Sequence, residues 1–226
     1  MNTTNFQDYN FRVDRPAATL RHNVTESIRQ AIAVGRFGAG DRMPERDLCE
    51  MTGVSRTLVR EALRQLESEG IVEVIAHKGP IVATITREQA IGIYQVREVL
   101  EGLAAALFAT NAGDGDRAAL LVAFERVRTA YLKGDVLVRL AAKNQFYDCL
   151  VSGSGNQALG GALYMINSRA MILRGRSLQM PSRWRESLTE LEAILDALER
   201  RDPVEAHSRA VHHVRMASAV ALKSFD

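Results

Sequence analysis

The sequence has few of the features that mark secreted, disulfide-rich or membrane proteins. Its 226 residues include two cysteines, five prolines and one tryptophan, and the longest uninterrupted apolar run, Leu103 to Ala109, is short. A helix that crosses a bilayer needs about 20 apolar residues. The start, MNTTNFQDYNFRVD, lacks the basic residues and apolar centre of a signal peptide. We therefore expect a cytoplasmic protein with no membrane partner, in which Cys49 and Cys149 are small packed side chains.

A strong excess of charge is also missing. The formal net charge is +2, and residues 1–80 carry eleven Lys or Arg against eleven Asp or Glu. Any binding to nucleic acid must therefore rest on where the charges are placed rather than on a bulk basic surface. Hydrophobic residues make up 46% of the chain and charged residues 25%, which is ordinary for a globular protein long enough for two modest domains.

The common catalytic motifs do not occur. The sequence contains no G-x-S-x-G elbow, no phosphate-binding loop with its lysine and no H-E-x-x-H zinc motif. The glycines of SGSGN at residues 152–156 match neither a nucleotide loop nor a nucleophile elbow and indicate a helix break. We expect neither catalysis nor a cofactor.

The most informative pattern runs from Gly40 to Val72. Pro44 suits the first turn of a helix that Gly53 can end with a positive φ, and Ser55 is a good N-cap for a second helix that ends at Gly70. Apolar residues recur at helical spacing in both segments, at Leu48 and Met51 in the first and at Val59, Ala62, Leu63 and Leu66 in the second. Two short helices, a tight turn and a following strand predict a winged helix-turn-helix.

Three arginines mark the polar side of the second helix. Arg56, Arg60 and Arg64 are four residues apart, so each is rotated by only ~40° from the last and together they form a cationic ridge. Guanidinium groups on such a helix can bind guanine or phosphates in the major groove. The alternative is a solvated helix face on which Glu61 and Glu67 pair with the arginines. The surrounding helix-turn-helix pattern favours DNA.

This segment resembles the DNA-binding domain of the GntR family of bacterial transcription regulators, whose pattern runs G-x-x-L-x-E-r-x-L-a and then G-V-S-R-T-x-V-R-E-A-L-r-x-L-e-x-x-G. The chain keeps Gly40, Glu45, Arg46 and Leu48, and then GVSRT, VREAL and the closing Gly70. Leu58 stands where many members have proline, a position at which proline is favoured but not required. Ile32 through Gly40 is similar to the end of the family's scaffold helix, which we expect over 18–35 after a polar arm at 1–16.

The resemblance implies roles for individual residues. Arg56 and Arg60 are expected at or near bases, Ser55, Thr57 and Arg46 at phosphates, and Arg64 along the same ridge. β-branched runs at 71–75 and 81–85 predict a hairpin with Gly79 at its tip, and the family's wing brings this glycine close to DNA, with His77 and Lys78 beside it. A solvated loop is the alternative.

The second half of the sequence predicts helices alone. Thr86 and Gln89 have capping-box spacing, and helices are expected at 87–111, 116–133, 136–152, 157–174, 184–200 and 203–223. This half resembles the helical effector domain of the FadR-type branch, in IYQVREVLEGLAA, FYDCLVSGSGN and RDPVEAHSRAVHHV. We therefore expect a mainly α protein with a winged helix-turn-helix domain at 1–83 and a helical effector and dimerisation domain at 84–226.

The expected effector site departs from the family pattern. Where many members hold a divalent metal, this chain has Lys143, Tyr147 and Leu191, and only His213 is kept. One imidazole beside an ammonium does not make a metal site, so we expect none. Instead, Arg97 and Lys143 are expected to hold a small organic anion, with Tyr147 and His213 as hydrogen-bonding partners. The alternative is that Lys143 reaches solvent and Tyr147 only packs.

These patterns together predict a homodimeric regulator that binds an inverted-repeat operator in double-stranded DNA and responds to an organic anion. A helical ligand-binding or adaptor protein without operator specificity is the alternative. The sequence of the operator and the identity of the effector do not follow from the residues.

Overall fold

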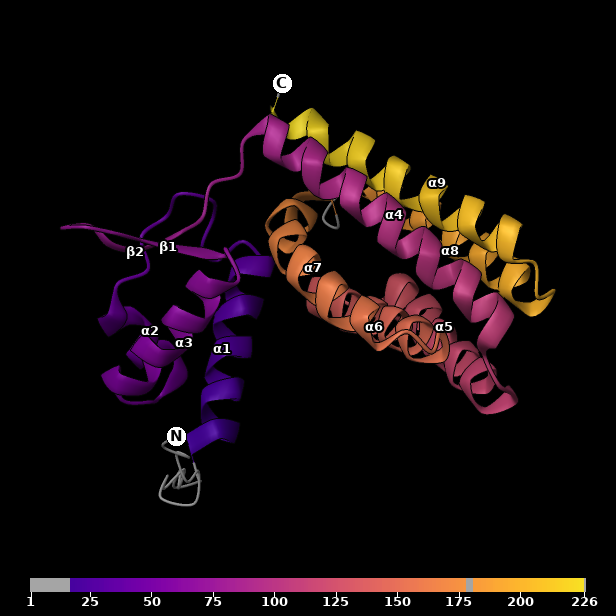
Figure 1. The fold of residues 1–226 in the computed structure, drawn as a ribbon. Coiled ribbons are helices and arrows are strands. Elements are labelled where there is room, and N and C mark those ends of the chain that lie inside the picture. Colours follow the sequence, from indigo (N-terminus) through magenta and orange to yellow (C-terminus); the bar gives the residue numbers. More distant parts are fainter. Residues whose placement is uncertain (1–16, 178–180, 226) are drawn as a thin grey trace, which may run out of the picture.

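The computed structural model describes residues 17–177 and 181–225 and confirms the mainly α fold (Figure 1). The part that we call the head contains α1 (Ala17–Ala33), α2 (Glu45–Thr52), α3 (Arg56–Ser68), β1 (Val72–Ile75) and β2 (Gly79–Val82). The part that we call the bundle contains α4 (Arg87–Asn111), α5 (Asp114–Lys133), α6 (Val136–Gly153), α7 (Gln157–Ser177), α8 (Pro181–Glu199) and α9 (Pro203–Leu222), followed by the 3₁₀ turn η2 (Lys223–Phe225).

The core of the head forms where the apolar faces of its three helices meet. Of the apolar residues predicted on α2 and α3, Met51 is half-buried and the others are buried: Leu48, Val59, Ala62, Leu63 and Leu66. Val24, Ile28 and Ile32 of α1 are buried with them. Gly53 ends α2 with φ 70°, a left-handed conformation that glycine adopts at little steric cost. Cys49 and Cys149 are both half-buried free thiols.

The hairpin differs from the expected one in the bounds of its second strand and in its tip. Val72 pairs with Val82 and Ile75 pairs with Gly79, so β2 begins at Gly79 and ends before residues 83–85. The tip is therefore Ala76–His77–Lys78, and Gly79 is the first strand residue rather than the tip. His77 has φ 64°, a backbone conformation that a sequence pattern of β-branched residues cannot reveal.

Two long neighbouring helices pack against each other in the bundle. α4 and α9 run side by side along one side of it (Figure 1). A Cβ added to Gly102 would lie 2.8 Å from the ring of His207, so glycine at this position allows α4 and α9 to approach closely. Thr86 and Gln89 form the predicted capping box at the start of α4. Two helix ends differ from the prediction, since α7 continues to Ser177 instead of ending at residue 174, and α8 begins at Pro181 instead of residue 184.

The head contacts the bundle through α1 and α3. Arg29 Nη2 lies 2.6 Å from Glu69 Oε2, and the same guanidinium group donates hydrogen bonds to Tyr164 and Ser168 of α7. The Tyr164 hydroxyl also donates to Glu69 Oε1. Within the described part of the chain, no helix is long and apolar enough to cross a membrane.

Candidate functional site

The solvent-facing side of α3 carries the three arginines in one row. Arg56, Arg60 and Arg64 are exposed, while Val59 and Leu63 on the opposite side of the helix are buried in the head core. The apolar face therefore fixes α3 on the head with its cationic side outward. This is the geometry that a recognition helix needs in order to enter a major groove.

A carboxylate of α2 holds the middle arginine. Glu45 Oε1 accepts a hydrogen bond from Arg60 Nε at 2.7 Å, and this bond and the charge of Glu45 raise the pKa of Arg60. The sequence suggested Glu61 and Glu67 as partners, but among the described residues neither pairs with the ridge. Arg56 and Arg64 make no ion pair within the described part of the chain, so their guanidinium groups are open to solvent.

The other residues expected at DNA lie on α2, at the start of α3 and at the hairpin. Arg46 is exposed near Asp47 and Glu50, at 3.4 and 3.8 Å. Ser55 occupies the N-cap position of α3, as predicted, but its hydroxyl makes no capping hydrogen bond. Thr57, His77 and Lys78 are also exposed, and Gly79 is half-buried. Without a side-chain cap, the first N–H groups of α3 remain suited to an anion such as phosphate.

The four residues expected at an effector lie together inside the bundle. Arg97, Lys143, Tyr147 and His213 come from α4, α6 and α9, and each is less than a tenth exposed. Lys143 Nζ lies 3.0 Å from His213 Nε2 and 5.9 Å from the centre of the Tyr147 ring. Their role in binding a ligand stays a prediction.

The sequence reasoning missed the carboxylates of this cluster. Arg97 Nη2 lies 2.7 Å from Glu101 Oε1, on the same face of α4. Glu190 of α8 lies beside His213, with 2.5 Å between Oε2 and Nδ1, and accepts two hydrogen bonds of 2.7 Å from Arg183. The spacing of Arg97 and Glu101 is readable in the sequence, whereas nothing local predicts that Glu190 and His213 meet.

The partners of His213 define its proton state. Lys143 can only donate, so Nε2 accepts, and Nδ1–H donates to Glu190. Burial and then the charge of Lys143 lower the pKa of His213 to about 3, so the imidazole is neutral at neutral pH. Burial also opposes the charge on Glu190, but hydrogen bonds from His213 and Arg183 outweigh it and lower that pKa to about 2.

The cluster does not fit a divalent metal. The described residues contain no group of three His, Cys, Asp or Glu side chains placed to hold one. His213 Nε2 faces the Lys143 ammonium, which would repel a cation, and Leu191 is a fully buried core residue without a donor atom.

Acidification is expected to destabilise the protein through His213. Its pKa is about 3 in the folded protein against an ordinary 6.5, so below pH 6.5 the unfolded chain binds a proton that the folded protein does not. The free energy of unfolding should therefore fall by about 2 kcal/mol between pH 7 and pH 5. The depressed pKa of Glu190 affects the free energy of unfolding only when the pH falls below 4.5, the ordinary pKa of a glutamate.

Urea unfolding at pH 7 and pH 5 measures this effect. The variant His213→Gln has no group at this position that titrates in the range, and its free energy of unfolding should lack this part of the fall. Equal falls in both proteins would contradict the assignment of a neutral imidazole.

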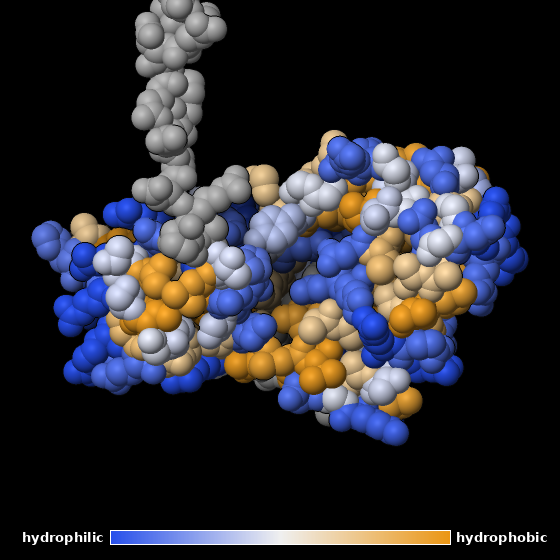
Figure 2. Space-filling view, turned by 90° about the horizontal axis from the view of Figure 1, so that it is seen from below, coloured by the Kyte–Doolittle hydropathy of each residue, from blue (hydrophilic) through white to orange (hydrophobic). Residues whose placement is uncertain are grey.

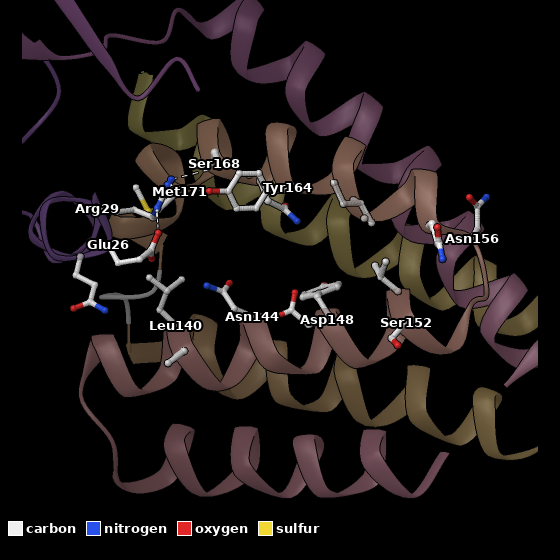
Figure 3. Close-up of a pocket in the computed structure, with 18 of the residues that line it drawn as sticks. Glu26, Arg29, Leu140, Asn144, Asp148, Ser152, Asn156, Tyr164, Ser168 and Met171 are labelled. Atoms are coloured by element: carbon white, nitrogen blue, oxygen red, sulfur yellow. Dashed lines mark hydrogen bonds and ion pairs between the residues drawn. The ribbon is translucent and has the colours of Figure 1, made fainter. Parts of the chain in front are cut away.

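A cleft separates the head from the α6–α7 helical hairpin. It has a volume of about 770 Å³, within the size range of small-molecule sites. The hollow between the head and the bundle is visible in Figure 2. Figure 3 shows Asn144, Asp148 and Ser152 on one wall and Tyr164 on the other, with Glu26 and Arg29 of the head at one end. Tyr147 also lines the cleft, whereas its neighbours in the buried cluster do not.

Comparison with known families identifies both halves of the chain. Residues 20–82 match the family of bacterial regulatory proteins named gntR, and residues 92–216 match the FCD domain. A relative from Paenarthrobacter nicotinovorans, named "Probable D-xylose utilization operon transcriptional repressor", is 30% identical over 87% of this chain and 86% of its own length. A second relative, the regulator YdhC of Bacillus subtilis, is 26% identical over 90% of this chain and 91% of its own.

Solved structures show the same fold. The Escherichia coli protein McbR/YncC superposes with a TM-score of 0.81 at 23% identity, covering 92% of this chain and 99% of its own. A GntR regulator from Rhodococcus sp. RHA1 has a TM-score of 0.78 at 22% identity and covers 92% of this chain and 100% of its own. The relatives are named as transcription regulators rather than enzymes. The protein therefore belongs to the GntR family of bacterial transcription regulators and combines a helix-turn-helix with an FCD domain.

Proposed function

We propose that the protein binds an inverted-repeat operator as a homodimer and that a small organic anion in the bundle modulates this binding. The domains would be 1–83 for DNA and 84–226 for the effector and the dimer. The row of exposed arginines on α3, together with the exposed tip of the wing, carries the DNA part of the proposal. Arg56 and Arg60 would contact bases, with Ser55, Thr57, Arg46, Arg64 and the wing at the backbone.

Charge and unpaired donors support an anionic effector. Arg97, Lys143 and Arg183 give the cluster three buried cations. The carboxylates inside it are the buried Glu101 and the half-buried Glu190, a difference of one positive charge, and the exposed Glu186 approaches Arg183 from outside at 3.7 Å. Arg97 Nη1 and the Tyr94 hydroxyl on α4, and the Ser187 hydroxyl on α8, are buried without a hydrogen-bond partner among the described residues. Unpaired buried donors cost about 1–3 kcal/mol each, and the oxygens of a carboxylate would satisfy them.

An exposed apolar stripe on α4 supports a homodimer. Val96, Val99 and Leu103 are spaced for one helix face, and their exposed fractions are 46%, 65% and 39%. A second copy would cover the same stripe, because a two-fold axis places identical surfaces against each other. Such a dimer presents two α3 helices to the two halves of an inverted repeat.

Gel-shift titration tests the DNA part of the proposal against a helical adaptor. The probe is the DNA upstream of the protein's own gene, measured from 50 to 200 mM salt beside an unrelated fragment of the same length. Arg46, Arg64 and Lys78 on each of two protomers would neutralise six phosphates, so the slope of log K against log salt should be about −5. Binding equally weak on both fragments would favour the adaptor.

A further inference from the structure

We propose that the cleft between α1 and the α6–α7 hairpin is a second ligand site, for an elongated organic cation whose ammonium group binds Asp148. This site would lie on the other side of α6 from the anion site proposed in the bundle, would share only Tyr147 with it, and would have the opposite charge preference. Binding of such a cation does not depend on the proposed DNA function. Any effect of the cation on DNA binding rests on the proposed DNA function.

One side of α6 forms a continuous wall of the cleft. Leu140, Asn144, Asp148 and Ser152 are four residues apart and line the cleft, and Figure 3 shows Leu140, Asn144 and Asp148 pointing into it. At a rise of 1.5 Å per residue, the distance along the helix from Asp148 to Leu140 is about 12 Å. Lys143 belongs to the neighbouring face of α6, which points into the bundle. One helix thus separates an amide- and carboxylate-lined cleft from the buried cationic cluster.

The charges of the cleft favour a cation. Asp148 has no ion pair or hydrogen bond from its side chain to any described residue, and Arg29 is already paired with Glu26 and Glu69. The charged residues that line the cleft are Glu26, Asp148 and Arg29, with a sum of −1. Asp148 is exposed in the cleft, and partial desolvation by the surrounding protein raises the pKa of its carboxyl group, so the carboxylate would gain from an ammonium partner. A dianion in the same place would meet repulsion.

The rest of the cleft suits the carbon chain and far end of such a ligand. Leu140 and Met171 line it and are both less than a tenth exposed, so they offer apolar contact to methylene groups. Both also pack against the core of the head. Beyond them lies Glu26 of α1, whose side chain is 37% exposed. Its Oε1 accepts a hydrogen bond from Arg29, and its other oxygen, Oε2, can receive a second ammonium group. A diamine aligned along α6 would therefore touch the head and the bundle at once.

Calorimetric titration of the full-length, DNA-free protein tests the site with three probes of equal length: 1,5-diaminopentane, 1,5-pentanediol and glutarate. We expect the diamine to bind and the other two to bind at least tenfold more weakly. Asp148→Asn should weaken binding of the diamine at least tenfold. Asp196→Asn removes one carboxylate from an exposed position of α8 and should leave binding unchanged.

A second variant tests the site even if Asp148→Asn fails to fold. Ser152 is exposed and one turn from Asp148, so Ser152→Lys should fold and place a competing ammonium beside the carboxylate, with the same loss of diamine binding. The proposal is overturned if the wild-type protein does not bind the diamine, if the diol or glutarate binds as well, or if folded Asp148→Asn binds as tightly as the wild type.

Discussion

Arg56→Ala is expected to weaken operator binding by about 1–3 kcal/mol per half-site and to relax the preference at one base pair in each half. Arg56 is the first residue of α3, and its guanidinium group has no ion pair among the described residues. It can therefore form a bidentate contact with a guanine at no cost in broken internal bonds. Binding titrations against operators with single base-pair substitutions measure both effects.

Two variants sharpen this measurement. Arg200→Ala removes an exposed arginine from the end of the bundle and should leave operator affinity and base preference unchanged. Arg64→Ala should weaken all operator sequences alike and reduce the salt slope by about 1 per protomer, because a phosphate contact carries no base information. If Arg56→Ala also lowers affinity uniformly across all sequences, Arg56 is a phosphate contact and base reading lies elsewhere on α3.

Lys143→Met is expected to abolish the response to the effector while operator affinity without the effector stays nearly unchanged. The ammonium group contributes a buried positive charge next to His213, and a carboxylate ligand would lose its ion pair when this charge is removed. Operator binding should persist because Lys143 lies in the bundle, on α6, and not on the DNA-facing side of the head. The ligand would first be sought among small carboxylates that change operator affinity of the wild-type protein.

The rise in melting temperature on adding that ligand gives a readout independent of DNA. Wild-type protein should show the rise, and Lys143→Met should not. Lys133→Met is the matched control, since this lysine is exposed at the end of α5. The substitution of Lys143 also leaves His213 Nε2 without its donor, so some loss of basal stability is expected. An unaltered response in Lys143→Met would rule out the anion site as proposed.

Local sequence signals determined most of the secondary structure. Apolar spacing placed the faces of α1, α2 and α3, and Gly53 and the Thr86 capping box set helix ends, because these features depend on residues within one or two helical turns. The arginine row on α3 follows from the same periodicity, since the buried face of a helix determines which residues remain outside. The bounds and tip of the hairpin did not follow, because the backbone turns there through positive φ values at His77 and Gly79, which β propensity does not reveal.

Only the tertiary structure decided which distant charges meet. Glu45 pairs with Arg60 across 15 residues of sequence, and Glu190 pairs with His213 across 23, between different helices. No spacing rule predicts such pairs, because the docking of whole helices sets their distance. The contacts of Arg29 with α7, more than 130 residues away, likewise exist only because the head lies against the bundle. The cleft beside these contacts lies between the head and the bundle, whose sequence patterns are independent of each other. Its shape, and the absence of an ion pair between Asp148 and any described residue, therefore follow only from how the two parts pack together.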